Sequence, residues 1–399
     1  MKSKKFVLAG LVLLAITGLL ALAGRKNDSV PETPAAKLVS ISVTPSEGTV
    51  YKVGDEVVHK KGDEIGVTAH YDNGPTRPVT GTITTDTNTL TKSAGVQTVT
   101  VRYSEGGIGV SGQFEIRVLP KELTDYTSPN NTGSEWTYVE FGEWPQTIKD
   151  ASVNVYETKS KEMGMFTYYL GSDDNYYVKI TAKPYEDTYT YSDGNPVEKD
   201  EEVYFKVEPI KWRVLNKDYA STGKAMLLAE SILIGGIKWA DSSNIYMESY
   251  IRQWLNGNSG TGETSDYGGD AGFLQTAFTE SDWELIADTT VDNSGAASTT
   301  DKIFLLSEQE ATTSVYGFAA QGIKDSTRIR VTTDYAKATG TYQDSRPGYG
   351  GWWWLRSPFY DYESLARGID DRGFADSNDA VDISYGGVVP ALSISLKSN

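Results

Sequence analysis

The fold of the C-terminal half is decided by two stretches, Gly350-Gly351-Trp352-Trp353-Trp354-Leu355-Arg356-Ser357-Pro358 and Gly387-Val388-Val389-Pro390-Ala391-Leu392. The first is the densest aromatic cluster in the chain, and tryptophan side chains are usually well buried. We therefore expect Trp353, Leu355 and Arg356 to belong to the core, with the Arg356 guanidinium held in a polar network. The second stretch continues to Leu396 and predicts a closing strand.

Residues 359–387, between these two stretches, have an unusual composition. Their 29 residues include no Lys, Gln, Met or Trp and a single Glu, although the rest of the chain is rich in Lys, Glu and Trp. Tyrosine supplies rigid contact area and Ser, Asn and Gly adapt to a partner, as in antibody binding loops. The composition favours a recognition surface; an ordinary loop biased to Gly, Asp and Ser is the alternative.

Small and apolar residues recur through this segment and are predicted to form its buried framework. The predicted framework comprises Trp353, Leu355, Arg356, Ala366, Ile369, Gly373, Val381 and Pro390. The polar and aromatic residues between them are predicted to be exposed and to bind the ligand. They are Phe359, Tyr360, Asp361, Tyr362, Arg367, Asp370, Asp371, Arg372, Phe374, Asp376, Ser377, Asn378, Asp379, Asp382, Ser384 and Tyr385.

Working outward, residues 134–399 predict an irregular α+β domain with long Gly-, Ser- and Asp-rich loops. Apolar runs predict strands over 207–215, 225–229 and 303–306. Apolar residues at helical spacing predict a helix over 250–256, which Asn256-Gly257 should end. The same spacing over 271–286 is broken by a turn near 279–281.

Residues 37–119 alternate apolar and polar positions, which is typical of strands with one buried face. The alternation covers 38–43, 65–71, 96–103 and 114–118, with turn-forming residues between these runs. Several short strands at this spacing indicate a β-sandwich.

The two domains are preceded and separated by polar segments. Residues 1–23 have a basic start, a 17-residue apolar run and a small-x-small cleavage site, which is the pattern of a signal peptide. An uncleaved membrane anchor is the alternative, because the run is at the short limit for a bilayer span. Residues 24–36 predict a polar tether, and residues 120–133 predict a linker.

The charge of the chain excludes some partners. Removing the signal segment takes away three lysines and no acid, so the formal net charge changes from −17 to −20. Such a chain repels phosphate backbones and anionic lipids, so nucleic acid and bare membrane are not expected partners. Contact with a membrane is expected only through an uncleaved signal segment.

The inventory of reactive side chains is small. The chain has no Cys, and both histidines, His59 and His70, are expected at ordinary strand positions of the first domain. The second domain therefore lacks the residues for Ser-His-Asp or Cys-His catalysis and for ordinary zinc or copper sites. No cofactor is expected. The run from Asp376 fails the EF-hand calcium pattern at Ala380 and Val381, so no metal is predicted either. An irregular calcium site in this Asp-rich loop is the alternative, since oxygen-rich loops bind calcium in many geometries.

Residues 37–119 resemble the bacterial immunoglobulin-like domains of surface proteins. The resemblance is carried by three stretches: Tyr51-Lys52-Val53-Gly54-Asp55, Val79-Thr80-Gly81, and Leu90-Thr91-Lys92-Ser93-Ala94-Gly95 leading into Val99-Thr100-Val101. It implies a spacer or adhesive module.

Residues 134–399 resemble the Treponema variable protein family. The match rests on Trp353-Trp354-Leu355-Arg356-Ser357-Pro358 with Gly387-Val388-Val389-Pro390-Ala391-Leu392, and on the upstream Phe141-Gly142-Glu143-Trp144-Pro145, Trp212-Arg213-Val214-Leu215 and Ile251-Arg252-Gln253-Trp254-Leu255-Asn256. The resemblance implies a C-type-lectin fold of the formylglycine-generating-enzyme type. It also implies a C-terminal segment diversified by a retroelement that mutates adenines, which fits the absence of Lys, Gln, Met and Trp from 359–387. Val389 stands where the family usually has Arg.

The expected architecture is thus an all-β immunoglobulin-like sandwich followed by an irregular α+β C-type-lectin-like domain. The expected function is non-enzymatic, adhesin-like recognition of a protein or glycan through 359–387 by an exported protein. Its expected location is the bacterial cell surface, the outer membrane or the medium. Two alternatives remain: a carboxylate-based glycan hydrolase, since acids alone can run glycoside hydrolysis, and a structural envelope protein without a specific ligand.

Overall fold

A computed structural model describes residues 36–46, 48–120, 136–216, 222–257 and 271–396. The predicted signal peptide and nearly all of the predicted tether and linker lie outside these ranges. The described residues form a β-rich chain in which two separate hydrophobic clusters are buried, one within residues 38–118 and one within residues 119–394. No helix within the described ranges is long and apolar enough to cross a membrane.

The N-terminal domain is all-β, as the alternating pattern predicts. Its strands follow one hydrogen-bonded path in the order β1-β3-β4-β5-β6-β2. Their bounds are β1 (Leu38–Val43), β2 (Val50–Lys52), β3 (Glu64–Tyr71), β4 (Arg77–Ile83), β5 (Gly95–Glu105) and β6 (Ile108–Leu119), with a 3-10 turn η1 (Thr87–Thr89) before β5. The sheet curls until Gly112 of β6 lies against Ile41 and Val43 of β1. All four strands predicted here are confirmed, and the buried face of each contributes to the first hydrophobic cluster.

The two histidines occupy different kinds of position. His70 lies in β3, where its Nε2 is 2.9 Å from Ser42 Oγ. His59 was expected in a strand and instead lies in the loop between β2 and β3, with its ring edge-on to Phe114. The expectation was wrong for His59 because the polar residues around it, in Val53–Asp63, do not alternate and form turns.

The second domain is organised around a large sheet whose strands differ in length. Seven strands follow the order β16-β21-β12-β11-β10-β9-β8, and β7 pairs with β11. Their bounds are β7 (Tyr138–Ile148), β8 (Val155–Met163), β9 (Phe166–Gly171), β10 (Tyr176–Thr181), β11 (Glu202–Val214), β12 (Lys224–Ala229), β16 (Ile303–Phe304) and β21 (Ala391–Ser395). The closing strand β21 thus pairs with β12 in the middle of the domain, which buries the C-terminal stretch quoted above.

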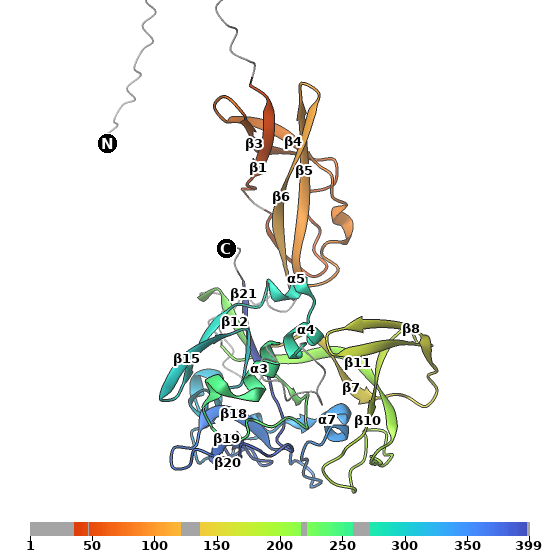
Figure 1. Cartoon of the computed structure of the whole chain (residues 1–399), viewed down its shortest axis with the longest axis vertical. Helices are drawn as coiled ribbons and strands as arrows, with labels where there is room; N and C mark the ends of the chain where they lie inside the picture. The colour runs from red at the N-terminus through yellow and green to blue at the C-terminus, as the bar shows by residue number, and fades with distance from the viewer. Residues whose placement is uncertain (1–35, 47, 121–135, 217–221, 258–270, 397–399) are drawn as a thin grey trace, which may run out of the picture.

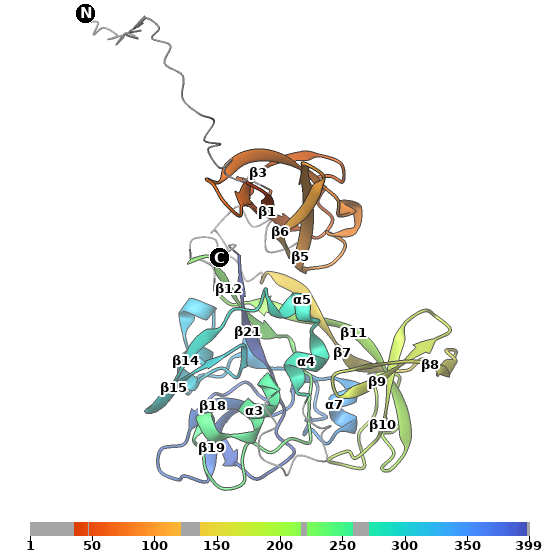
Figure 2. The same cartoon turned by 45° about the horizontal axis from the view of Figure 1, so that its top comes forward.

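Three smaller sheets lie beside the large one. They are the parallel pair β13 (Ser231–Ile232) and β17 (Val331–Thr332), the hairpin β14 (Thr289–Asn293) and β15 (Ala296–Asp301), and the three-stranded sheet β18 (Trp353–Pro358), β19 (Leu365–Ile369) and β20 (Ser377–Ala380). In Figure 1 and Figure 2 this last sheet lies at the end of the molecule opposite the N-terminal domain.

The helices of the second domain are short. They are α3 (Tyr250–Asn256), α4 (Phe273–Ala277), α5 (Glu280–Trp283), α6 (Glu308–Ala311) and α7 (Asp334–Ala338), with 3-10 turns η2 (Tyr246–Glu248), η4 (Ser314–Tyr316) and η5 (Ser326–Arg328). The predicted helix over 250–256 is confirmed: Ser249 Oγ caps its first turn, and Gly257 ends it in the left-handed conformation at φ 77°. The predicted break near 279–281 is also confirmed, since Thr279 caps α5.

The domains contact each other through β5, β6 and α5. Ser281 Oγ of α5 donates a 2.7 Å hydrogen bond to the carbonyl of Val96. Gly95, at φ +135°, leaves room for this contact, because a Cβ there would lie 2.3 Å from Ser281 Oγ. Arg117, buried at the end of β6, donates to the carbonyls of Glu284 and Ser395. These contacts tie the N-terminal domain to both α5 and the last strand.

Candidate recognition face

The segment 359–387 is carried by the sheet β18-β19-β20. Trp353 pairs with Ile369, and Leu365 pairs with Ala380, so the segment folds back twice beside the tryptophan stretch. All eight predicted framework residues are buried, which confirms that part of the prediction; they are Trp353, Leu355, Arg356, Ala366, Ile369, Gly373, Val381 and Pro390. Val389, at the position of the family's usual Arg, is also fully buried.

Arg356, whose own side chain is buried, holds the base of this sheet through a polar network. Its two terminal nitrogens donate to both carboxylate oxygens of Glu310, and one of them also donates to the carbonyl of Leu305 at 2.6 Å. Its Nε donates to the carbonyl of Asp292 at 3.0 Å. A buried guanidinium is tolerated when its donors are satisfied in this way, so the predicted polar network around Arg356 is confirmed.

The loop after β18 is held in one shape by a residue far away in sequence. The side-chain amide of Asn244, which is buried, donates to the carbonyls of Phe359, Tyr362 and Leu365 at 3.2, 3.1 and 2.8 Å. The backbone N–H of Asn244 donates to the carbonyl of Glu363 at 2.8 Å. Four backbone carbonyls of one short loop therefore converge on one residue, which fixes the loop's shape without using its side chains.

This fixed loop displays two tyrosines. The side chains of Tyr360 and Tyr362 are 72% and 62% exposed. The ring of Tyr362 stacks on the ring of Phe359, with 6.0 Å between centroids. The Arg367 guanidinium lies 4.6 Å from the centroid of the same Phe359 ring. Tyr360 reaches the β14–β15 hairpin, where its hydroxyl donates to the carbonyl of Ser294 at 3.4 Å. Both aromatic rings are thus held by contacts within the chain.

Arg367 connects this loop to the rest of the face. Its Nε lies 3.3 Å from Glu308 Oε1, and its Nη1 donates to the carbonyl of Asp376 at 3.2 Å. Burial raises the pKa of Glu308, while the charge of Arg367 acts in the opposite direction. The single cation of β19 is therefore engaged by an acid from α6.

One predicted contact residue is structural. Asp370 is 8% exposed, and its carboxylate accepts hydrogen bonds from the backbone N–H groups of Arg372 and Phe374 and from the Arg372 guanidinium. Asp370 closes the turn after β19, as Asp commonly does. The prediction that Asp370 is exposed was wrong, because residue spacing does not distinguish a carboxylate that faces solvent from one that caps its own turn. Its assignment as a ligand-binding residue stays a prediction. Gly373 completes the turn at φ +87°, where a Cβ would lie 2.1 Å from the carbonyl of Asp325.

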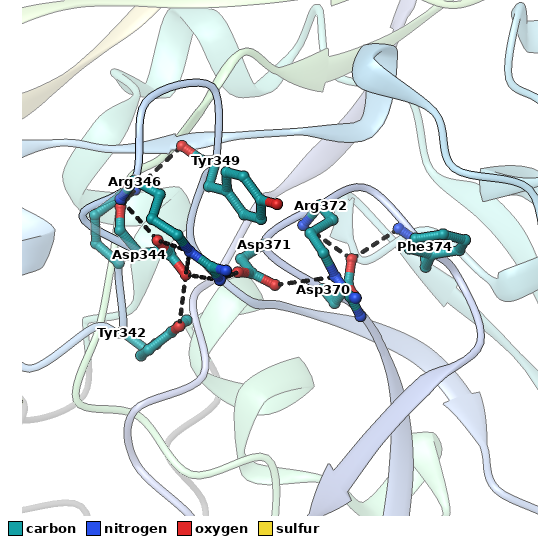
Figure 3. Close-up of polar contacts among 9 residues, drawn as sticks. Tyr342, Asp344, Arg346, Tyr349, Asp370, Asp371, Arg372 and Phe374 are labelled. Carbon is teal, nitrogen blue, oxygen red and sulfur yellow. Dashed lines mark hydrogen bonds and ion pairs between the residues drawn. The ribbon is translucent and has the colours of Figure 1, made fainter.

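Beside this turn, two carboxylates share one arginine (Figure 3). Arg346 donates to Asp344 at 2.9 Å and to Asp371 at 3.2 Å, and its guanidinium stacks over Tyr349 at 4.1 Å. The hydrogen bonds from Arg346 lower the pKa of Asp344. The pKa of Asp371 is raised by burial and by the neighbouring Asp344 carboxylate. Tyr342 borders the group, with its hydroxyl 3.4 Å from Asp344.

The remaining predicted residues lie on β20 and the loop after it. Asp379 accepts a 2.5 Å hydrogen bond from the Tyr385 hydroxyl, and Ser377 accepts one from the indole N–H of Trp352. Asp376, Asp382 and Ser384 are exposed. Across the whole predicted set, the exposed residues are Tyr360, Asp361, Tyr362, Arg372, Asp376, Asp382 and Ser384, and the half-buried ones are Phe359, Arg367, Asp371, Phe374, Ser377, Asn378, Asp379 and Tyr385.

Several residues of this face come from outside the predicted segment. They are Asn244, Glu308, Tyr342, Asp344, Arg346 and Tyr185, the last of which contacts the rings of Tyr342 and Tyr385. The sequence contains no pattern that ties Asn244 to a segment more than 100 residues away.

Metal binding has no visible basis in the described ranges. No group of three or more His, Cys, Asp or Glu side chains there is arranged to hold a metal ion. The acids near Asp376 do not converge on one point. Asp379 accepts a hydrogen bond from the Tyr385 hydroxyl, and Asp382 is exposed. The absence of a metal stays a prediction.

Two cavities lie away from this face. One, of about 510 Å³, lies between the domains and is lined by residues that include Ala94, Phe141 and Lys161. The other, of about 530 Å³, is lined by acids and lysines near the start of β8, including Asp150, Asp173 and Lys206. Neither is lined by a residue of 359–387.

Comparison with known proteins gave one match. Residues 222–396 are similar to a family described as a domain of unknown function, DUF6273. The matched region begins near β12, ends just after β21 and includes the whole of 359–387. No curated protein and no solved structure matched the chain.

Proposed function

We propose that this protein is a non-enzymatic, exported binding protein that recognises a macromolecular ligand through the face built on 359–387. The observation that carries the proposal is the display of Tyr360 and Tyr362 on a loop whose carbonyls are held by Asn244. Exposed aromatic rings cost solubility, and rings fixed before binding lose little entropy on binding. Such an arrangement favours recognition over a merely structural loop.

The rival proposal of a glycan hydrolase has a carboxylate pair available, Asp344 and Asp371. Their unequal environments push their pKa values apart, which is a pattern that acid–base catalysis uses. However, Arg346 binds both carboxylates, and their side chains are only 8% and 14% exposed. A glycosidic bond has to lie between the two carboxylates of a hydrolase, and in Figure 3 the Arg346 guanidinium lies there. This geometry supports binding over hydrolysis.

We further propose a fold family for each domain. The N-terminal domain is immunoglobulin-like and serves as the spacer of an adhesin-like protein. Residues 134–399 form a C-type-lectin-like domain of the Treponema variable protein type. Support comes from the buried framework beneath a surface rich in Tyr, Asp and Ser. The position of the face at the end opposite the N-terminal domain also suits display at a cell surface (Figure 1). Sequencing of neighbouring DNA tests the diversification: a near-copy of the 359–387 coding segment beside a reverse transcriptase gene is expected.

The binding proposal is tested with residues 24–399, labelled and applied to arrays of purified extracellular proteins and of glycans. We expect the wild type to bind a defined subset and the double variant Tyr360→Ser/Tyr362→Ser to lose it, since central aromatic residues are each worth about 2 kcal/mol or more in an interface. Tyr156→Ser is the matched control, because Tyr156 is 41% exposed on β8 and outside the face. Binding that survives the double variant contradicts the assignment of the face. Release of reducing sugar that Asp371→Asn abolishes supports the hydrolase instead.

A further inference from the structure

Three tyrosines from three separate segments meet at one side of the recognition face. Tyr185, from the loop between β10 and β11, lies 4.8 Å from the ring of Tyr385 and 5.9 Å from the ring of Tyr342, between centroids. We call these three residues the tyrosine cluster. Only Tyr385 belongs to 359–387. Tyr185 is 46% exposed, and Tyr342 and Tyr385 are half-buried.

The backbone around the tyrosine cluster is held from several sides. The N–H of Tyr342 donates to the carbonyl of Tyr385 at 3.0 Å, which fixes these two residues against each other. The N–H of Lys183 donates to the carbonyl of Ala338 at 2.7 Å and so anchors the loop that carries Tyr185. The cluster is therefore a formed surface, contributed jointly by the segment 359–387 and by the rest of the domain.

Carboxylates surround the tyrosine cluster. The hydroxyl of Tyr385 donates to Asp379, and the hydroxyl of Tyr342 lies 3.4 Å from Asp344. Burial, together with the charges of Asp371 and Asp344, raises the pKa of Tyr342 to about 12, so this hydroxyl stays protonated. Tyr185 is followed directly by the exposed acids Glu186 and Asp187.

The three arginines of the face, Arg346, Arg367 and Arg372, are already paired with acids. Segment 359–387 contains seven acidic residues and two arginines. Arg367 is paired with Glu308, and Arg372 is paired with Asp370. Arg346 is paired with both Asp344 and Asp371. The face therefore presents tyrosine rings within an excess of negative charge.

We propose that the tyrosine cluster binds lysine or arginine side chains and that the ligand is a protein with a basic surface segment. The inference rests on the proposed function and narrows its ligand from a protein or glycan to a basic protein. Cations are attracted to the faces of tyrosine rings, and acidic surroundings steer and retain them. The chain already uses this contact internally: Lys161 lies 4.0 Å over Tyr176, and Lys211 lies 4.3 Å over Tyr138. A neutral glycan would gain nothing from the charge.

The test uses residues 24–399 and three probes: a synthetic peptide of alternating Lys and Ser, its Glu and Ser counterpart, and a neutral oligosaccharide. Binding is measured by calorimetry at low and at physiological ionic strength. We expect binding of the basic peptide alone, weakened by salt. Tyr185→Ala should weaken it by about twofold to thirtyfold, the range that a cation–π contact of about 0.5–2 kcal/mol implies. Tyr185→Phe, which keeps the ring, should bind as the wild type does.

Tyr156→Ala is the matched control, because it removes an exposed tyrosine without changing the charge or the face. Equal binding by Tyr185→Ala, Tyr156→Ala and the wild type overturns the inference, since non-specific attraction to an acidic chain would give that result. Preferential binding of the oligosaccharide also overturns it. The array experiment separates the two proposals. If a ligand depends on Tyr360 and Tyr362 but is not basic and binds Tyr185→Ala as well as the wild type, only this inference is overturned. If both Tyr360→Ser/Tyr362→Ser and Tyr185→Ala keep the ligand, the proposed face itself is overturned.

Discussion

The side-chain amide of Asn244 donates a 2.8 Å hydrogen bond to the carbonyl oxygen of Leu365, 121 residues further along the chain. The same amide reaches the carbonyls of Phe359 and Tyr362, so one side chain sets the shape of the loop that carries the exposed tyrosines. The shape of the most exposed part of the face thus depends on a buried residue outside it.

Replacing Asn244 by Ala should therefore destabilise the second domain. Loss of the amide removes its three hydrogen bonds to the carbonyls of Phe359, Tyr362 and Leu365, each of which keeps one backbone N–H donor, at a cost of about 1–3 kcal/mol in the free energy of unfolding. Denaturant unfolding followed by tryptophan fluorescence measures this cost. Asn195→Ala is the control, because Asn195 is exposed and its side-chain amide donates to the nearby Asp193. An unchanged midpoint for Asn244→Ala would contradict the role given to its amide.

Framework and face should respond oppositely to substitution. Trp353 is fully buried, and its indole N–H donates to the carbonyl of Arg328 at 3.1 Å. Trp353→Ala should cost roughly 3–5 kcal/mol, as expected for removal of a large buried aromatic side chain. Tyr360→Ser/Tyr362→Ser should leave the melting temperature nearly unchanged, since both rings are mostly in solvent. Scanning calorimetry distinguishes the two results, and a large loss in the double variant would place those rings in the core.

The alternating patterns were enough to predict β1, β3, β5 and β6 but not β2 or β4, and helical spacing predicted α3, because local rules decide these elements. Apolar residues at periods of two or about four are visible in the sequence, and Ser249 and Gly257 mark the helix ends. The strand β8 was missed, since nearly all of its residues are exposed and no apolar face reveals it. The buried framework of the face was predicted from its small and apolar residues. The partners of that face were not, because Asn244, Tyr185 and Tyr342 reach it only through tertiary folding.

Residues 37–119 should unfold cooperatively as an isolated fragment. The hydrophobic cluster of that domain is made of its own side chains, among them Ile41, Val99 and Ile116. Domains with a core of their own commonly fold alone. Thermal melting followed by circular dichroism measures this, and a broad, featureless transition would show that the fragment depends on the second domain.

Arg117→Ala should uncouple the domains without unfolding either. It removes the hydrogen bonds from β6 to the carbonyls of Glu284 and Ser395. Small-angle scattering of residues 24–399 should show a larger radius of gyration, and calorimetry should show transitions that separate. Arg102→Ala is the matched control, because Arg102 is an exposed arginine of β5 away from the interface. Equal scattering from both variants would show that the contacts of Arg117 do not hold the domains together.

The stability of the N-terminal domain should depend on pH through Glu105. Hydrogen bonds from Arg77 and from the hydroxyl of Tyr71 lower the pKa of Glu105 to about 2 from its ordinary value of 4.5. Because the folded state binds this proton less readily than the unfolded state, the stabilisation is present above the unfolded value and is lost as the pH falls towards about 2. The difference in melting temperature between the wild type and Glu105→Gln should therefore shrink between about pH 6 and pH 2. A constant difference would contradict the pKa assignment.

The contacts of Arg117 and Ser281 add a second connection between the two domains to the covalent one. One is covalent and runs through residues 121–135. The other is the set of hydrogen bonds from β5 and β6 to α5 and to Ser395, at the end of the last strand. The strand that ends at Ser395 also follows the segment 359–387 directly in the chain. Under the proposed function, a tensile force on a bound ligand would therefore be shared between the backbone and this interface, so that β5 and β6 would carry part of the load from the last strand.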